Sequence, residues 1–200
     1  LNIAKKLKEL TSEKFQAAFL VNGQKGLADA AGIGAIAAKK GAPILFTSNS
    51  RLEATRSDLG QLGIDNAYVI GGNLSLVGEF DRIATSVERI AGSNRQETSL
   101  KMMNKFNPNP AVVYLTDDGG VRANRLIDAV LINSGIIASN AQASASDKGV
   151  EQVGPGKSSK PSNLAEGAVL LVNSNNGLSF NQYKTLYNMS SLTGLTQVSG

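Results

Sequence analysis

The chain of 200 residues contains no cysteine and no histidine. Without cysteine it can form no disulfide and no thiolate nucleophile, and without histidine it cannot build the Ser-His-Asp and Cys-His catalytic arrangements. Zinc sites that need nitrogen or sulfur ligands are excluded for the same reason. These absences remove the commonest nucleophilic and zinc-dependent catalytic centres.

Aromatic residues and long apolar runs are scarce. Aromatic residues make up 5% of the chain, which argues against a stacking surface for single-stranded nucleic acid. The best candidate for a membrane span, residues 28–38, is short and is followed by Lys39 and Lys40. The sequence therefore predicts no nucleic-acid partner and no membrane span.

The chain does contain enough apolar residues to build a folded core. Hydrophobic residues make up 42% of it and charged residues 18%, so wholesale disorder is not expected. The net charge of +4 and the pI near 9.3 favour anionic partners. Because residue 1 is leucine rather than methionine, we expect the chain to be a processed or excised piece of a longer protein.

The most informative feature that is present is an internal repeat. The matching segments are 1–7 with 100–106, 27–30 with 126–129, 41–49 with 167–175, and 68–72 with 196–200. A motif at residues 89–98 lies between the two copies. The sequence therefore predicts a tandem pair of one module, and such repeats more often bind or scaffold than catalyse.

Strands and helices are predicted to alternate within the first module. The expected strands are 17–21, 43–47, 66–70 and 87–90, and the expected helices are 27–40, 52–62 and 76–84. The strands are continuous apolar runs, which is typical of a parallel sheet covered by helices on both faces. The carboxyl ends of these strands should then lie along one edge. That edge would carry Asn22, Thr47, Gly71 and Gly72.

The second module is predicted to keep this order with an insertion. We expect the first module at residues 1–88, without a preceding copy of the motif, and the second at residues 89–200, without its last helix. The insertion, residues 141–166, is rich in Ser, Ala, Gly, Lys and Pro, so we expect a mobile surface loop. Both ends of the chain look cut from a longer array.

Several segments together resemble one known family. The motif 89–98, the helix start at 28–30, the strand segment 41–47 and the segment 68–72 closely resemble the bacterial cell wall binding repeat 2 family. The resemblance is dense over residues 1–106 and looser in the second module. It depends on several separate motifs that occur in the right order.

The resemblance implies a non-catalytic anchoring domain of exported Gram-positive proteins, notably clostridial surface-layer and cell wall proteins. Such domains are Rossmann-like α/β modules, usually present as three repeats packed together. The expected fold is thus α/β, with tandem Rossmann-like modules and parallel sheets flanked by helices. The expected location is extracellular, in the cell wall or surface layer. The expected partners are an anionic secondary cell wall polysaccharide, other repeats of the same array and neighbouring surface-layer proteins.

Arg89 and Arg95 of the motif are the first candidates for contact with the polymer. A guanidinium group donates paired hydrogen bonds to phosphate or carboxylate in a fixed geometry. The alternative is that one arginine pairs with Asp29 or Asp128 of a neighbouring repeat and locks the modules together. A motif at every junction is as natural for a clamp as for a ligand site, and we favour the clamp.

The other candidates come from the motif, the predicted sheet edge and the charge pattern. Open α/β sheets receive ligands at the carboxyl ends of their strands, and positive charge captures a polyanion at long range. The complete set of candidate polymer-binding residues is Arg89, Asn94, Arg95, Asn22, Lys25, Thr47, Asn49, Arg122 and Arg125.

Three further features have a structural interpretation that we prefer. Asp29 lies near a helix start, where a carboxylate stabilises the helix by roughly 0.3–1 kcal/mol. Asp117 and Asp118 precede two glycines and suggest a solvated turn rather than a cation site. Residues 44–46 fall on a segment that the family associates with wall attachment, but a buried central strand explains the same pattern.

A nucleotide-dependent enzyme is the least favoured class. Residues 154–158 resemble a phosphate-binding loop, but Glu151 stands where that motif needs glycine. Residues 22–26 hold two glycines at the wrong spacing for a dinucleotide site. We therefore predict no catalytic residue, no metal site and no cofactor. The alternative function is a structural domain that tiles a surface layer and has no polymer site of its own.

Overall fold

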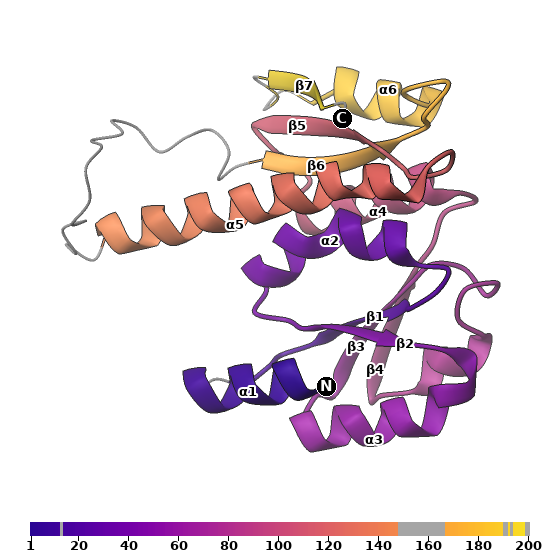
Figure 1. Cartoon of the computed structure of the whole chain (residues 1–200), viewed down its shortest axis with the longest axis vertical. Coiled ribbons are helices and arrows are strands. Elements are labelled where there is room, and N and C mark those ends of the chain that lie inside the picture. The colour runs from indigo at the N-terminus through magenta and orange to yellow at the C-terminus, as the bar shows by residue number, and fades with distance from the viewer. Residues whose placement is uncertain (13, 148–166, 190–191, 193, 199–200) are drawn as a thin grey trace.

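The computed structural model of the chain describes residues 1–12, 14–147, 167–189, 192 and 194–198. Its helices and strands in chain order (Figure 1) are α1 (Asn2–Thr11), β1 (Ala18–Asn22), α2 (Leu27–Lys39), β2 (Ile44–Thr47), the 3₁₀ helix η1 (Asn49–Arg51), α3 (Leu52–Leu62), β3 (Asn66–Ile70), the 3₁₀ helix η2 (Gly78–Arg82), β4 (Ser86–Ile90), α4 (Arg95–Phe106), β5 (Val112–Asp117), the 3₁₀ helix η3 (Ala123–Arg125), α5 (Leu126–Asp147), β6 (Gly167–Val172), α6 (Phe180–Tyr187) and β7 (Gly194–Val198).

Two parallel sheets organise these elements. The first has the strand order β2-β1-β3-β4, and the second has the order β6-β5-β7. Every pair of neighbouring strands is parallel. In both sheets the strand that comes first in the chain lies between the next two, so the two modules share one topology. The predicted α/β fold with parallel sheets flanked by helices is confirmed.

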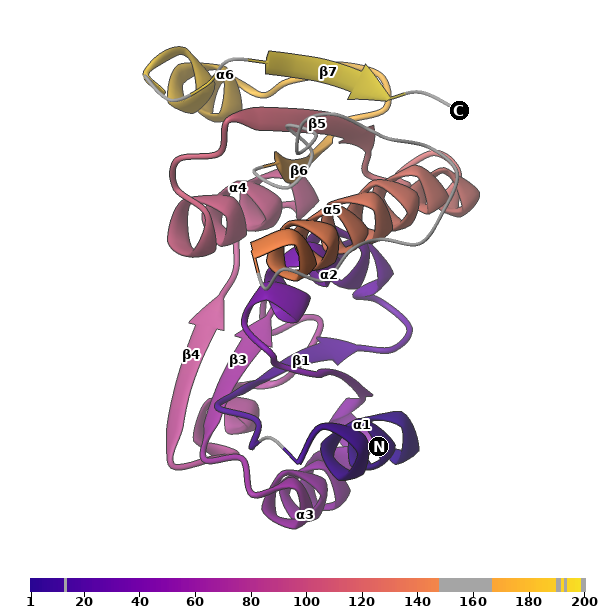
Figure 2. The same ribbon diagram turned by 90° about the vertical axis from the view of Figure 1, so that its left-hand side faces the viewer.

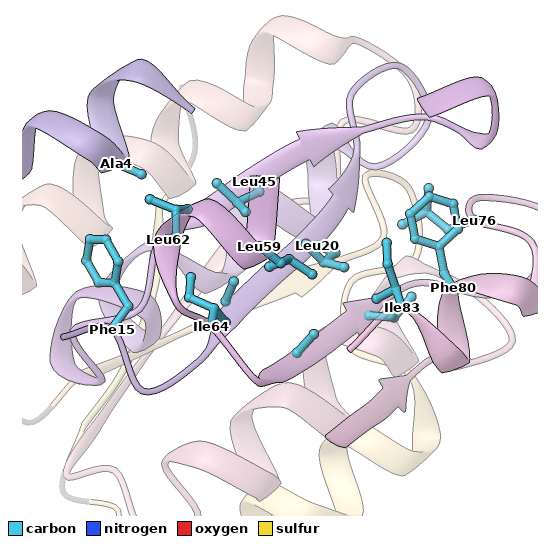
Figure 3. Packing of buried hydrophobic residues seen from close by; sticks show 13 residues of the cluster. Ala4, Phe15, Leu20, Leu45, Leu59, Leu62, Ile64, Leu76, Phe80 and Ile83 are labelled. Atoms are coloured by element: carbon cyan, nitrogen blue, oxygen red, sulfur yellow. The ribbon is translucent and has the colours of Figure 1, made fainter. Parts of the chain in front are cut away.

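Strand β1 forms the centre of the first core and is buried along its whole length. Because successive side chains of a strand point to opposite faces, Leu20 faces one layer while Phe19 and Val21 face another. Leu20 packs in a cluster with Leu59 of α3 and Phe80 of η2 (Figure 3). The opposite face is covered by α2 and α4. The continuous apolar run of β1 is explained by this burial on both sides.

Helices α2, α4 and α5 form the layer between the two sheets (Figure 2). Asn133 of α5 joins two helices, since its Nδ2 donates to the carbonyl of Ala31 at 2.6 Å and its Oδ1 accepts from the amide of Ala35 at 2.8 Å. A Cβ atom on Gly34 would lie 3.1 Å from the Cβ of Asn133. Glycine therefore lets α2 and α5 approach closely enough for these hydrogen bonds.

The prediction of a helix at residues 76–84 is wrong. The structure has only the 3₁₀ helix η2, Gly78–Arg82, in this segment. Gly78 is a poor helix former, and the carbonyl of Val77 accepts a hydrogen bond from the side chain of Arg89 at 3.0 Å. This contact with a distant residue fixes the backbone in a compact turn instead of an α-helix.

The prediction of a buried central strand at residues 44–46 is also wrong for the first module. Strand β2 lies at the sheet edge, because the crossovers place β1 and β3 inside. Leu45 is buried, but Phe46 is 57% exposed. The equivalent β6 is an edge strand as well, yet all of its residues are buried because α2 and α4 pack against it.

The insertion at residues 141–166 does not begin as a loop. Helix α5 continues to Asp147, since residues 141–147 contain alanine, which favours helix, and neither glycine nor proline. The rest of the insertion, with the segment 154–158, lies outside the described residues. The same holds for residues 199–200 at the end of the repeat.

Candidate functional site

The carboxyl ends of the strands meet at one edge of each sheet, as predicted. Asn22 at the end of β1 pairs in register with Thr47 at the end of β2, and Asp117 of β5 pairs with Val172 of β6. Helices α2 and α5 both begin at these edges, on the right-hand side of Figure 1. The loops that follow β1 and β5 therefore lie on one side of the molecule.

Asn22 shapes the first of these loops. Its Oδ1 accepts hydrogen bonds from the amides of Gln24 and Lys25 at 2.9 and 2.8 Å, and its Nδ2 donates to the carbonyl of Ser75 at 2.6 Å. The buried Asn22 amide is thus occupied by the fold. Lys25 is exposed, and its Nζ donates to the carbonyl of Leu74 at 3.3 Å, which leaves the ammonium group further donors for a ligand.

Thr47 and Asn49 also contact the first module. Thr47 is buried, and its Oγ1 lies 2.5 Å from Oγ1 of Thr55. Asn49 is exposed, and its Oδ1 accepts from the amide of Val77 at 3.0 Å. Thr47 therefore stabilises the end of β2, whereas the Nδ2 group of Asn49 can reach solvent.

Arg89 is held inside the first module. Its Nε donates to Oδ1 of Asp81 at 2.7 Å, while Nη1 and Nη2 donate to the carbonyls of Gly71 and Val77 at 2.8 and 3.0 Å. The side chain is 15% exposed. These contacts favour a structural role for Arg89, and its acidic partner is Asp81 rather than an aspartate of a neighbouring repeat.

Arg95 occupies a different environment at the start of α4. It is exposed, and its Nη1 donates to the carbonyl of Asp118, the residue that follows β5, at 3.1 Å. Its positive charge also lowers the pKa of Asp29 of α2, against the larger effect of burial, which raises it. Arg95 thus lies where α2 of the first module approaches the end of β5. The rest of its guanidinium group remains available to an anion.

Asp29 is buried beside this junction. No hydrogen bond joins its carboxylate to another described residue, and a Cβ atom on Gly71 would lie 3.0 Å from its Oδ2. Burial raises the pKa of Asp29 to about 6, and the nearby charge of Arg95 limits the rise. Asp29 lies in the first turn of α2, as predicted, but its carboxylate caps no backbone amide among the described residues.

The motif 89–98 connects a strand to a helix. Asn94 is the N-cap of α4, since its Oδ1 accepts from the amide of Glu97 at 2.9 Å. Oγ1 of Thr98 accepts from the amide of Gly92 at 2.9 Å. A Cβ atom on Gly92 would overlap the side chain of Glu97. Most of the motif therefore fixes the turn from β4 into α4.

Asp117 and Asp118 do not form a solvated turn, so that expectation is wrong. Asp118 is 3% exposed and accepts hydrogen bonds from Nε2 of Gln96 and, at 2.7 Å, from the amide of Gly120. Ser174 donates to Oδ1 of Asp117 at 2.7 Å. The first turn of α4 and the loop after β6 cover both carboxylates, and neither segment is close to them in sequence.

Asp117 pairs with one of the two arginines of the next loop. Its Oδ2 lies 3.1 Å from Nη1 of Arg125. Partial burial opposes its ionisation, but hydrogen bonds from Ser174 and Gly119 and the charge of Arg125 together hold its pKa below the ordinary value. Arg122 is exposed, and its side chain has no polar partner among the described residues.

The edge thus separates the predicted residues into two groups. Asn22, Thr47, Arg89 and Asn94 are engaged by the fold. Lys25, Asn49, Arg95, Arg122 and, in part, Arg125 present polar groups to solvent. Sequence reasoning missed Asn133, although it stands out as a polar residue in an apolar helix and aligns with Gly34 at the repeat offset of Asp29 and Asp128.

Among the described residues, no three acidic side chains lie together in a group that could hold a metal ion. No helix in the described part of the chain is long and apolar enough to span a membrane. The donors presented to solvent at this edge are the amide of Asn49 and the cationic groups of lysine and arginine, which suit an anion.

Part of the chain is similar to a known protein family. Residues 1–79 match the family described as Cell wall binding domain 2 (CWB2). This part of the chain thus resembles a cell wall binding domain. The amidase LytC of Bacillus subtilis (strain 168), named N-acetylmuramoyl-L-alanine amidase, is 36% identical over 91 residues, which cover 45% of this chain and 18% of LytC.

Two solved structures share the fold over almost the whole chain. Cwp8 from Clostridium difficile has a TM-score of 0.68 and 25% identity, covering 99% of this chain and 29% of Cwp8. Cwp6 from the same organism has a TM-score of 0.67 and 18% identity, covering 99% of this chain and 27% of Cwp6. The chain thus spans less than a third of the length of each of these two proteins.

Proposed function

We propose that this chain anchors an exported protein by binding an anionic secondary cell wall polymer without covalent chemistry. The observation that carries the proposal is the set of solvent-facing cations near the strand ends of a chain whose residues 1–79 match the CWB2 family. Lys25 belongs to the first module, Arg95 to the junction and Arg122 to the second module. A polyanion lying along this edge would contact both modules at once.

The physical basis of such binding is multivalent electrostatics. Each exposed cation alone binds an anion weakly, and linkage makes later contacts intramolecular. Salt screens exposed charges over about 10 Å at 0.1 M, so affinity should fall as salt rises. None of the groups at this edge needs to change a covalent bond, and the proposed role is non-catalytic.

Other repeats of the same array are the second proposed partner. Four exposed apolar residues follow one face of α5: Ile127, Val130, Leu131 and Ile137. Their helical spacing places them on one face of α5, where the exposed Ser134 lies between Leu131 and Ile137. The packing of α4 against β6 supports a second module that begins with α4. Because β4 (Ser86–Ile90) pairs with β3 of the first sheet, we propose that the boundary follows Ile90 rather than residue 88.

The test is co-sedimentation with purified Gram-positive walls before and after acid extraction of the secondary polymer, across a salt series. Binding that depends on the polymer and weakens with salt is the expected result. Equal binding to stripped walls would contradict the proposal and indicate peptidoglycan as the ligand.

A second candidate function, tiling within a surface layer, is favoured by the exposed apolar residues of α5 alone. It requires self-association, so sedimentation velocity over a range of protein concentrations separates the two functions. A monomer that binds walls supports the anchor. Concentration-dependent assembly without wall binding supports tiling.

A further inference from the structure

A cleft of about 830 Å³ lies at the opposite end of the first sheet from the edge described above. It opens between α1, the end of α2 and the starting ends of the strands. Small residues such as Ala17, Ala42 and Ala67 form part of its wall, which leaves the space open. A volume of this size accommodates a small-molecule or saccharide unit.

The cleft carries positive charge that the fold does not neutralise. Lys14, Lys39 and Lys40 line it and are exposed, and none of them forms an ion pair among the described residues. The described acid in the lining, Glu88, is paired with Lys105 at 2.7 Å. Lys39 in the last turn of α2 and Lys40 directly after it favour the helix dipole, and that role leaves their ammonium groups free to bind an anion.

The cleft also offers an aromatic surface beside this charge. Tyr68 is half-buried in its lining, and the ring stacks on Phe19 with centroids 5.2 Å apart. The Tyr68 hydroxyl has no hydrogen-bond partner among the described residues. Lys40 lies 5.0 Å from the centroid of Phe106, which holds a cation close to this aromatic group. An amphipathic ring with a free hydroxyl suits a sugar, which has both apolar faces and hydroxyl groups.

We infer that this cleft is a second binding site for an anionic saccharide unit, separate from the strand-end edge. The inference rests on the proposed function, because it assigns the same class of ligand. The two sites share no residue and lie at opposite ends of β1, whose five residues span about 16 Å. One chain could therefore hold two segments of polymer.

The experiment maps a defined anionic probe, tetragalacturonate, on the full chain by amide chemical shifts. Expected are shifts at Tyr68 and around Lys39 and Lys40, and no such shifts with neutral maltotetraose. The double variant Lys14→Gln/Lys39→Gln should weaken this binding about fivefold, since it removes two exposed charge contacts. The single variant Lys14→Gln, which lies outside every helix and strand, should weaken it by a smaller factor.

The matched control is Lys184→Gln, which removes one exposed lysine from α6 of the second module and should leave the affinity of the cleft unchanged. Shifts confined to the strand-end edge, or cleft shifts that the double variant does not weaken, would overturn the inference. Wall co-sedimentation of the unmodified chain is measured in parallel. If the unmodified chain binds walls but the probe does not bind the cleft, only the cleft site is rejected. If the unmodified chain does not bind walls, the proposed function is rejected.

Discussion

Arg89 and Arg95 belong to the same motif, yet the two ends of that motif differ in environment. Arg89 at the end of β4 is mostly buried and donates to one carboxylate and two carbonyls. Arg95 at the start of α4 is exposed and donates to one carbonyl across the junction. Burial and the number of acceptors, rather than residue type, therefore decide which of the two arginines can contact a ligand.

The two sheet edges differ in a similar way. Asn22 and Asp117 occupy equivalent places, and each accepts a hydrogen bond from the amide two residues further on. Asn22 is neutral and its other hydrogen bonds go to backbone groups, whereas Asp117 pairs with Arg125. The second edge therefore depends on ionisation, and the first does not.

The largest effect is expected for Arg89→Ala, which should lower the free energy of unfolding by about 3 kcal/mol. The reason is the loss of a mostly buried guanidinium with three hydrogen bonds. Chemical denaturation measures it, with Arg122→Ala as a control that removes an unpartnered arginine. A loss below about 0.5 kcal/mol would contradict the structural role, since surface substitutions usually stay within that range.

Asp29→Asn should change how the stability of the fold depends on pH. Because the folded pKa of about 6 lies above the ordinary value of 3.8, Asp29 stabilises the fold below pH 3.8, and this contribution is lost as pH rises through 6. The variant should therefore be about 2–3 kcal/mol more stable than the parent at pH 8 and nearly equal to it below pH 4.

The measurement for Asp29→Asn is denaturation at a series of pH values, repeated in 1 M salt. Burial is the dominant cause of the raised pKa, so the difference should persist when salt screens the charge of Arg95. A stability difference that does not grow between pH 4 and pH 8 would show that Asp29 is not buried as described.

Asn133→Ala should uncouple α5 from α2. It removes a 4% exposed amide that bonds to the backbone at Ala31 and Ala35, and we expect a loss of about 2 kcal/mol in unfolding free energy. Thermal denaturation provides the measurement. The neighbouring Ser134→Ala is the control, because that exposed side chain bonds only within α5. Equal stability of both variants would mean that Asn133 does not join the modules.

Much of the fold could be predicted because local pattern determines it. The apolar runs of β1 and β3 are buried in the interior of a parallel sheet, where continuous hydrophobicity is required. Helix α3 occupies the predicted residues and ends at Gly63, whose φ of +69° favours glycine. The meeting of strand ends at one edge then follows from the parallel arrangement.

The features of the fold and of the site that could not be predicted depend on contacts between residues distant in sequence. The burial of Asp118 arises from Gln96 of α4 and from Ser174 after β6. The acceptors of Arg89 lie in the turn that replaces the predicted helix. The motif alone does not contain such partners, and Arg89 and Arg95 therefore remained candidates for the same two roles, polymer contact or a clamp between modules.

The smallest expected effect distinguishes the exposed Arg95 from the mostly buried Arg89 as the residue that contacts the polymer. Arg95→Gln should reduce wall co-sedimentation about twofold at 0.1 M salt, as expected for one exposed charge contact, with little change in stability. Arg89→Ala, assayed under conditions where it is folded, should bind walls like the parent. If Arg95→Gln binds walls normally and folded Arg89→Ala does not, Arg89 rather than Arg95 contacts the polymer, and the proposed roles are wrong.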